Sequence, residues 1–352
     1  MIVYWTMYIL PTLAALFGLG RKGEEGQREL PMIIALFLFF VIVMGFRYEV
    51  GGDWDNYVVI VKNISLERLS TALSYGDPGF TLIAWLSNQL GLGVYGANLG
   101  CALFLLYGLF RLARTLPDSW LAIATAVPYM LIVIGMGYVR QGAAIGFIML
   151  AMRDLERRQM VWTVVHLALA IVCHIAAICI LPLIAIGIAG KRPFYLIPIC
   201  IVGLCCYAFI LSDRADHFYS AYVEQDYESS GAVVRLAMNL LPAGVYLRFR
   251  DRFPIQEPVQ TVWRLFAIVS LALPVFLLVL PSTALDRVGL FFSPIQVIVF
   301  GYATTIFSNN RREQRFATFA AAAYYGAVQF VWLNFATFSA YWLPYQSVLF
   351  QS

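Results

Sequence analysis

Long runs of apolar residues alternate with short polar loops along almost the whole chain of 352 residues. A run of about 20 apolar residues is long enough for a helix to cross a bilayer core roughly 30 Å thick. The pattern therefore predicts an all-α, polytopic membrane protein with about twelve membrane-spanning helices, some of them short. These cover approximately residues 1–19, 31–46, 94–112, 119–136, 139–152, 161–172, 174–189, 194–211, 232–249, 262–280, 288–307 and 316–338.

Two stretches between the predicted spans are long enough to carry structure of their own. Residues 47–93 contain amphipathic pieces that we expect at the membrane surface, because the second piece is too short for an untilted span. Residues 212–231 are rich in acids and tyrosines, which predicts an exposed loop. Two short spans meet at Cys173 and His174, and such a break is tolerated where it lines a protein cavity. We expect one integral-membrane domain over residues 1–352.

Composition and charge agree with this class and orient the chain. The sequence is 61% hydrophobic and 12% charged, whereas soluble domains are about 45–50% apolar and roughly 25% charged. One set of loops holds 17 of the 24 Lys and Arg residues. By the positive-inside rule these loops are cytoplasmic, which places both termini outside. The first apolar run lacks a basic n-region and precedes Arg21 and Lys22, so we expect a first span rather than a cleavable signal.

The predicted outer side carries charges close to the apolar spans, where ionisable groups are costly and usually functional. The segment 46–57, FRYEVGGDWDNY, follows an apolar run and contains Arg47 and Asp53. The two glycines before Asp53 permit a sharp turn. We expect Asp53 to act either as a general base or as the N-cap of the amphipathic stretch that follows.

Three further arginines stand at the outer ends of predicted spans, namely Arg140, Arg235 and Arg287. Guanidinium is always charged and binds phosphate in a bidentate manner, so their convergence would form an anion site. For Arg140, the alternative is a side chain that snorkels to the headgroups. Its small neighbours suggest close helix packing or room for a ligand. Asp286 is not an automatic partner of Arg287, because adjacent helical residues point in different directions.

His174 and the aromatic residues leave alternatives open. His174 is either an interhelical hydrogen-bonding residue or a proton acceptor, since histidine titrates near neutral pH. Tyr57 and other outer aromatics suit stacking on sugar rings, although an interfacial aromatic belt explains them equally well. The sequence has no P-loop, GxSxG or HExxH motif, so we expect neither a nucleotide nor a metal cofactor.

Six motifs in a fixed order resemble the EpsG family of bacterial exopolysaccharide polymerases, which are Wzy-like and related in plan to O-antigen ligases. They are FRYEVGGDWDNY at 46–57, YGDPGF at 75–80, VRQGAAIGF at 139–147, CHIAAICILP at 173–182, SGAVVR at 230–235 and DRVGLFF at 286–292. The likeness covers most of the chain, and its opening motif is the most specific.

The resemblance implies a glycosyltransferase at the outer face of the bacterial inner membrane. It would transfer a growing glycan from undecaprenyl pyrophosphate to the non-reducing end of another lipid-linked repeat unit. Arg140, Arg235 and Arg287 would then bind pyrophosphate, with Arg47 as a second clamp or as a partner of Asp53. Asp53 is the first candidate for the base and His174 the second. A chain-length-regulating co-polymerase and a flippase are the implied protein partners, and no nucleic acid is.

Three other functions compete with this interpretation. An O-antigen-type ligase would use the same chemistry on a terminal acceptor, although the opening motif favours a polymerase. A flippase or transporter of lipid-linked oligosaccharide would need a polar path through the bilayer, whereas charges in the middle of the predicted spans are nearly absent. A membrane scaffold subunit would leave the arginines at the span ends without a purpose.

Overall fold

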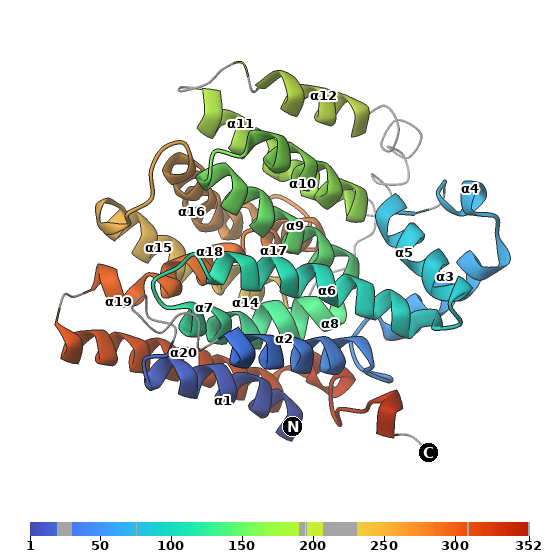
Figure 1. The fold of residues 1–352 in the computed structure, drawn as a ribbon, viewed down its shortest axis with the longest axis horizontal. Helices are drawn as coiled ribbons and strands as arrows, with labels where there is room; N and C mark the ends of the chain where they lie inside the picture. The colour runs from blue at the N-terminus through green and yellow to red at the C-terminus, as the bar shows by residue number, and fades with distance from the viewer. Residues whose placement is uncertain are drawn as a thin grey trace.

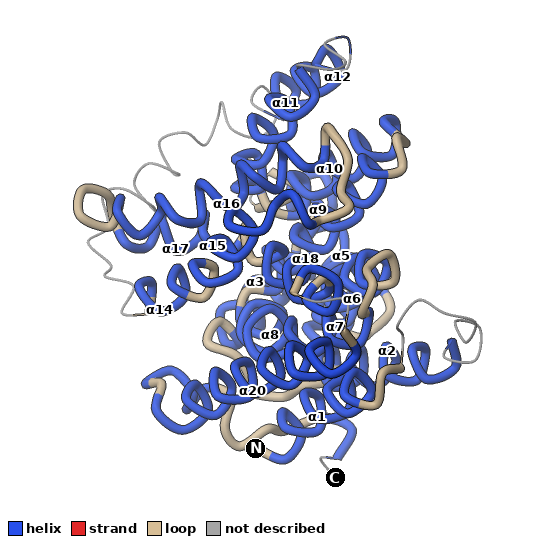
Figure 2. The backbone as a smooth tube through the Cα atoms, turned by 90° about the vertical axis from the view of Figure 1, so that its left-hand side faces the viewer, coloured by secondary structure: helices blue, strands red, loops and turns tan. Residues whose placement is uncertain are grey.

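The fold is helical throughout the part of the chain that the structure describes. The structure is a computed structural model that describes residues 1–19, 30–74, 76–189, 194, 196–206, 231–307 and 310–350. In these ranges the strand-like pairing is limited to an isolated antiparallel bridge between Arg47 and Ser347. Figure 2 shows helices joined by loops, without a sheet. The predicted all-α class is therefore confirmed for the described residues.

The N-terminal half forms long helices that lie side by side, with short helices at one end (Figure 1). The long helices are α1 (Ile2–Leu16), α2 (Leu30–Gly45), α6 (Gly93–Ala113), α9 (Val139–Glu156) and α10 (Met160–Cys173). The short helices are α3 (Trp54–Leu66), α4 (Leu69–Ala72) and α5 (Pro78–Gln89). Between α6 and α9, α7 (Ser119–Ala126) continues through a π-helical segment, η1 (Val127–Ile134), into α8 (Gly135–Gly137).

The C-terminal half has shorter and more often interrupted helices. They are η2 (Ile175–Ile180), α11 (Leu181–Ala189), α12 (Leu196–Cys206), α14 (Ala232–Ala237), α15 (Leu240–Phe249), η7 (Arg250–Arg252), α16 (Val259–Phe276), α17 (Ser282–Leu290), α18 (Pro294–Gly301), α19 (Ala303–Ile306), α20 (Arg311–Phe335), η8 (Thr337–Tyr341) and η9 (Val348–Phe350). Each predicted span overlaps a helix, but residues 207–211 of one span and the acidic loop at 212–230 lie outside the described residues.

The length and apolarity of the helices support a polytopic membrane protein. Fewer helices meet both criteria than the number of spans predicted from the sequence. Among the described residues, five helical segments are long and apolar enough to cross a membrane, and a sixth joins α17 and α18 across a 42° bend. The five are Gly93–Ala113, Ser119–Gly137, Ala232–Arg252, Val259–Phe276 and Arg311–Phe335. Other apolar helices, such as α1, α2 and α10, are shorter than 18 residues. The total of twelve spans stays a prediction.

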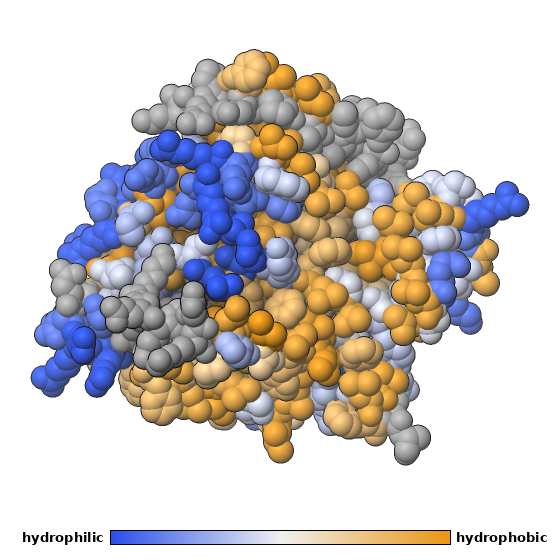
Figure 3. All heavy atoms as spheres, viewed as in Figure 1, coloured by the Kyte–Doolittle hydropathy of each residue, from blue (hydrophilic) through white to orange (hydrophobic). Residues whose placement is uncertain are grey.

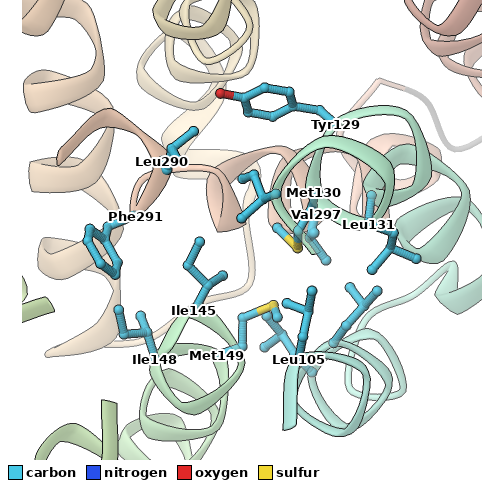
Figure 4. Packing of buried hydrophobic residues seen from close by; sticks show 14 of the residues in the cluster. Leu105, Tyr129, Met130, Leu131, Ile145, Ile148, Met149, Leu290, Phe291 and Val297 are labelled. Carbon is cyan, nitrogen blue, oxygen red and sulfur yellow. The ribbon is translucent and has the colours of Figure 1, made fainter. Parts of the chain in front are cut away.

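The centre of the bundle is the segment formed by α7 and η1, in which every residue is buried. Helix α9 packs against α6 and α10, and Arg140 is the one residue from Val139 to Leu155 that is not buried. Figure 4 shows Ile145 and Met149 of α9 among buried residues of neighbouring helices. The predicted close packing around small residues is found here. A Cβ atom on Gly146 would lie 2.3 Å from the carbonyl oxygen of Phe104 in α6, so the two backbones touch.

Both described chain ends lie at the same end of the bundle as α3 (Figure 1). The Tyr4 hydroxyl donates a hydrogen bond to the carbonyl of Trp342, and the Trp342 indole donates to the carbonyl of Ile132. Figure 3 shows hydrophilic residues gathered at the left-hand side of the molecule and at the tip near α3 and α4, with hydrophobic residues dominating between them. The termini therefore share one side, while the prediction that this side is external stays a prediction.

Candidate functional site

A buried carboxylate, that of Asp77, joins three segments at the end of the bundle where α3 and α5 lie. Asp77 precedes α5, and its side chain is 8% exposed. Its Oδ2 accepts a hydrogen bond from Arg140 at the start of α9 and lies 3.0 Å from Nδ1 of His174. Its Oδ1 accepts a bond from the backbone N–H of Ile175. Both carboxylate oxygens are thus occupied, which holds α5, α9 and the end of α10 together.

His174 occupies the predicted break in the helix. Helix α10 ends at Cys173, and His174 has an extended backbone before the 3₁₀ turn η2 begins. The ring stacks on Phe291 at 6.1 Å, and Nδ1 faces Asp77. Nε2 is buried and has no hydrogen-bond partner among the described residues. The interhelical hydrogen bond therefore uses one of the two ring nitrogens.

The surroundings of Asp77 keep its carboxylate charged. Burial by itself would raise the pKa of Asp77, but His174, Arg140 and the Ile175 amide outweigh it and lower the pKa below the ordinary value. A carboxylate with a lowered pKa is a poor proton acceptor. Asp77 is therefore suited to orienting His174 and Arg140 rather than to receiving a proton itself.

Arg140 is the partly exposed member of this group. Its side chain is 32% exposed, and its guanidinium lies 5.8 Å from the ring centroid of Tyr57 and 5.7 Å from that of Phe80. It stands in the first turn of α9, where the helix dipole already favours negative charge. A pocket of about 430 Å³ opens beside it, with Asp77 and Thr81 also in the wall. That Arg140 faces an outer anion site stays a prediction.

Arg287 lies on α17 near the same place. Its guanidinium sits 4.5 Å from the ring centroid of Tyr138, the residue that precedes α9. The side chain of Gln141 donates a hydrogen bond to the Arg287 carbonyl and thereby ties α17 to α9. Within the described ranges the Arg287 side chain has no ion pair and no hydrogen bond. Its positive charge is therefore available to an anion.

Asp53 is brought to these arginines by a glycine turn, as the glycine pair predicted. Gly51 has a φ of +111°, and a Cβ atom there would lie 2.3 Å from the carbonyl oxygen of Met136. Only glycine permits this approach of the loop to the start of α9. Burial raises the pKa of Asp53, against the opposing fields of Arg287 and Arg140. Asp53 stands at the N-cap position of α3, but its side chain makes no capping hydrogen bond.

Arg235 has a partner that the sequence did not predict. Its Nε and Nη2 atoms donate to the two carboxylate oxygens of Asp286 at 2.5 and 2.6 Å. This bidentate pair links α14 to α17 and is mostly buried, with side-chain exposures of 14% and 4%. Asp286 thus pairs with Arg235, 51 residues away, and not with its neighbour Arg287. Any contact of Arg235 with substrate stays a prediction.

Arg47 and Tyr57 are both buried in the structure. The Arg47 guanidinium donates hydrogen bonds to the carbonyls of Met44 and Val50 and to the side chain of Asn98. Burial lowers the pKa of Arg47 to about 10. Tyr57 is 4% exposed, and its hydroxyl accepts a hydrogen bond from Arg140.

The structure thus brings Asp53, Arg140 and Arg287 together, and it adds Asp77, which sequence reasoning left without a role. The signal for Asp77 was its place in the YGDPGF motif between two amphipathic pieces. Tyr75 of that motif and His217 lie outside the described residues. Across the residues described here, no group of three or more His, Cys, Asp or Glu side chains is placed to hold a metal ion.

We predict that Arg235→Leu lowers the free energy of unfolding by roughly 3–5 kcal/mol, because it leaves the buried Asp286 carboxylate without its partner. The double variant Arg235→Leu/Asp286→Leu should recover most of that loss, since both charges are gone. Denaturant unfolding in detergent measures both. Arg68→Leu, at an exposed arginine, is the control and should change stability by about 0.5 kcal/mol or less. A fully stable Arg235→Leu protein would contradict the assigned pair.

Comparison with known proteins gives a match at the level of the family. No curated protein matches the chain, and no solved structure does. The model of the EpsG family matches residues 31–347, nearly the whole chain. Membership of that family suggests a membrane protein of the exopolysaccharide-polymerase type, and in general terms a glycosyltransferase. The matched range includes every residue of the cluster described above, and the chain belongs to the EpsG family.

Proposed function

We propose that this protein is a polysaccharide polymerase acting at the outer face of the bacterial inner membrane. It transfers a growing glycan from undecaprenyl pyrophosphate to a hydroxyl at the non-reducing end of another lipid-linked repeat unit. The observation that carries the proposal is the convergence of Asp53, Arg140 and Arg287 at one end of an apolar helical bundle. A carboxylate beside two accessible guanidinium groups suits a reaction that needs both a base and an anionic leaving group.

Arg140 and Arg287 hold the pyrophosphate of the donor. As the glycosidic bond breaks, negative charge grows on the departing lipid pyrophosphate. Guanidinium groups that are already in place stabilise this charge more in the transition state than in the ground state. Arg287 suits this role because its side chain forms no direct ion pair among the described residues, although the Asp53 carboxylate lies within its electrostatic field. Arg140 is held by Asp77 and by the ring of Tyr57, which fixes its direction.

Asp53 accepts the proton of the acceptor hydroxyl. The hydroxyl oxygen forms a bond to the anomeric carbon of the donor sugar, and the bond from that carbon to the pyrophosphate oxygen breaks. Electrons of the broken bond leave with the lipid pyrophosphate. Asp53 is partly exposed, whereas Nε2 of His174 is buried, so an acceptor reaches Asp53 more easily. Its raised pKa also brings its basicity closer to what a general base needs.

The remaining predicted residues support this site rather than binding the pyrophosphate or the sugars. Arg47 is bonded to two backbone carbonyls and to Asn98, so we assign it to holding the turn before Asp53. Arg235 holds α17 through Asp286 and thereby positions Arg287. Tyr57 is too buried to stack on a sugar, and we assign it to supporting Arg140. His174 is a positioning residue that acts through Asp77.

Purified protein incubated with lipid-linked repeat units and a metal chelator should give a ladder of products on a gel. The reason is that the proposed site stabilises the leaving group with arginines. Addition of a single unit only would indicate a ligase of the O-antigen type, and the absence of product in the presence and in the absence of divalent ions would contradict a polymerase. Export of unreacted lipid-linked units into the opposite leaflet of a vesicle would indicate a flippase.

We predict that Asp53→Asn lowers the rate of glycosyl transfer by about 10²–10⁴-fold, the usual contribution of a general base. Asp55→Asn is the matched control on the same helix, at an exposed position, and should keep full activity. Because burial raises the pKa of Asp53, the wild-type rate should fall as pH drops through that raised value and the base becomes protonated. This acidic limb should vanish in the variant. Full activity of Asp53→Asn would move the base to His174.

A further inference from the structure

An apolar groove of about 440 Å³ runs between η1, α14 and α20. Its walls include Val133 of η1, Val234 of α14, and Val328, Val331 and Trp332 of α20. The polar groups in the wall are few, and the only charged side chain there is that of Arg235. The size lies within the range of pockets that bind small ligands, about 300–1,000 Å³.

The groove is open at the protein surface, where its walls expose apolar side chains. Val234 is 64% exposed, Val331 is 54% exposed and Phe335 is 72% exposed. The segment Ala232–Arg252 and helix α20 are both long and apolar enough to cross a bilayer. A π-helical segment such as η1 is rare and often marks a functional site. The groove can therefore accept a long apolar chain.

The groove is linked to the candidate active site through Arg235. Arg235 in the wall is bonded to Asp286, and Asp286 directly precedes Arg287 on α17. Tyr138 lies within electrostatic reach of Arg235, Arg287 and Asp53. A molecule whose apolar chain lies in the groove would thus place an anionic head beside Arg287.

We infer that this groove binds the polyprenyl chain of the glycan donor, with its pyrophosphate at Arg287. The inference rests on the proposed function and adds the position of the lipid. A bulk phospholipid fits less well, because the charged side chain in the groove wall, Arg235, is held by Asp286 next to Arg287. The pocket beside Arg140, which has Asp77 and Thr81 in its wall, is then left for the sugar residues.

The test fills the groove with a larger side chain. Ala327 is an exposed residue of α20 that lines the groove, and Ala320 is exposed on the same helix two turns earlier and does not line it. Native mass spectrometry of the detergent-purified full chain measures binding of undecaprenyl pyrophosphate, geranyl pyrophosphate and phosphatidylglycerol. The wild type should prefer the undecaprenyl over the geranyl compound, because more apolar surface is buried.

Ala327→Trp should weaken the binding of undecaprenyl pyrophosphate by about tenfold or more. It should leave the binding of geranyl pyrophosphate unchanged, so that the preference for the longer chain is lost. Ala320→Trp should bind both like the wild type. An Ala327→Trp protein that keeps the preference, or that loses only phosphatidylglycerol, would overturn the inference. Failure of the proposed function can be distinguished from failure of this inference. In that case the wild-type protein would bind the lipid but form no polymer.

Discussion

The buried carboxylate of Asp77 is the contact on which the arrangement of the site depends. It receives a guanidinium from α9, an imidazole from the end of α10 and a backbone N–H from the turn that follows. A buried charge is stable only when it is paired and hydrogen-bonded. Burial of Asp77 therefore requires that these segments meet at one point, and the helix break at His174 provides the N–H that completes the set. Arg140 takes its direction from this contact.

The arginines at this end of the bundle divide into two groups according to their partners. Arg47 donates hydrogen bonds to backbone carbonyls, and Arg235 donates hydrogen bonds to Asp286. Arg140 is paired with Asp77 but is 32% exposed, and the Arg287 side chain forms no ion pair among the described residues. The first group holds the loop and the helix that carry Asp53 and Arg287. This division explains how one end of an apolar bundle can keep positive charge available for an anionic substrate.

Much of the fold could be predicted from the sequence, because apolar runs, charged loops and glycines report local requirements. The helix break at His174 and the turn at Gly51 are examples. The pairing of Arg235 with Asp286 could not be predicted. These residues are 51 positions apart in the sequence, and their contact depends on how α14 and α17 pack. The burial of Arg47 could not be predicted either, because it depends on Asn98 and on backbone carbonyls that accept its hydrogen bonds. Composition does not determine such long-range partners.

The most direct measurement of the central claim is the affinity of Arg287→Ala for undecaprenyl pyrophosphate, with thermal stability measured in parallel. Because charged hydrogen bonds contribute about 1.5–3 kcal/mol, the variant should bind about 10–100-fold more weakly. Its unfolding temperature should stay close to that of the wild type, since the side chain has no ion pair to lose. Unchanged affinity in a folded Arg287→Ala protein would contradict the account.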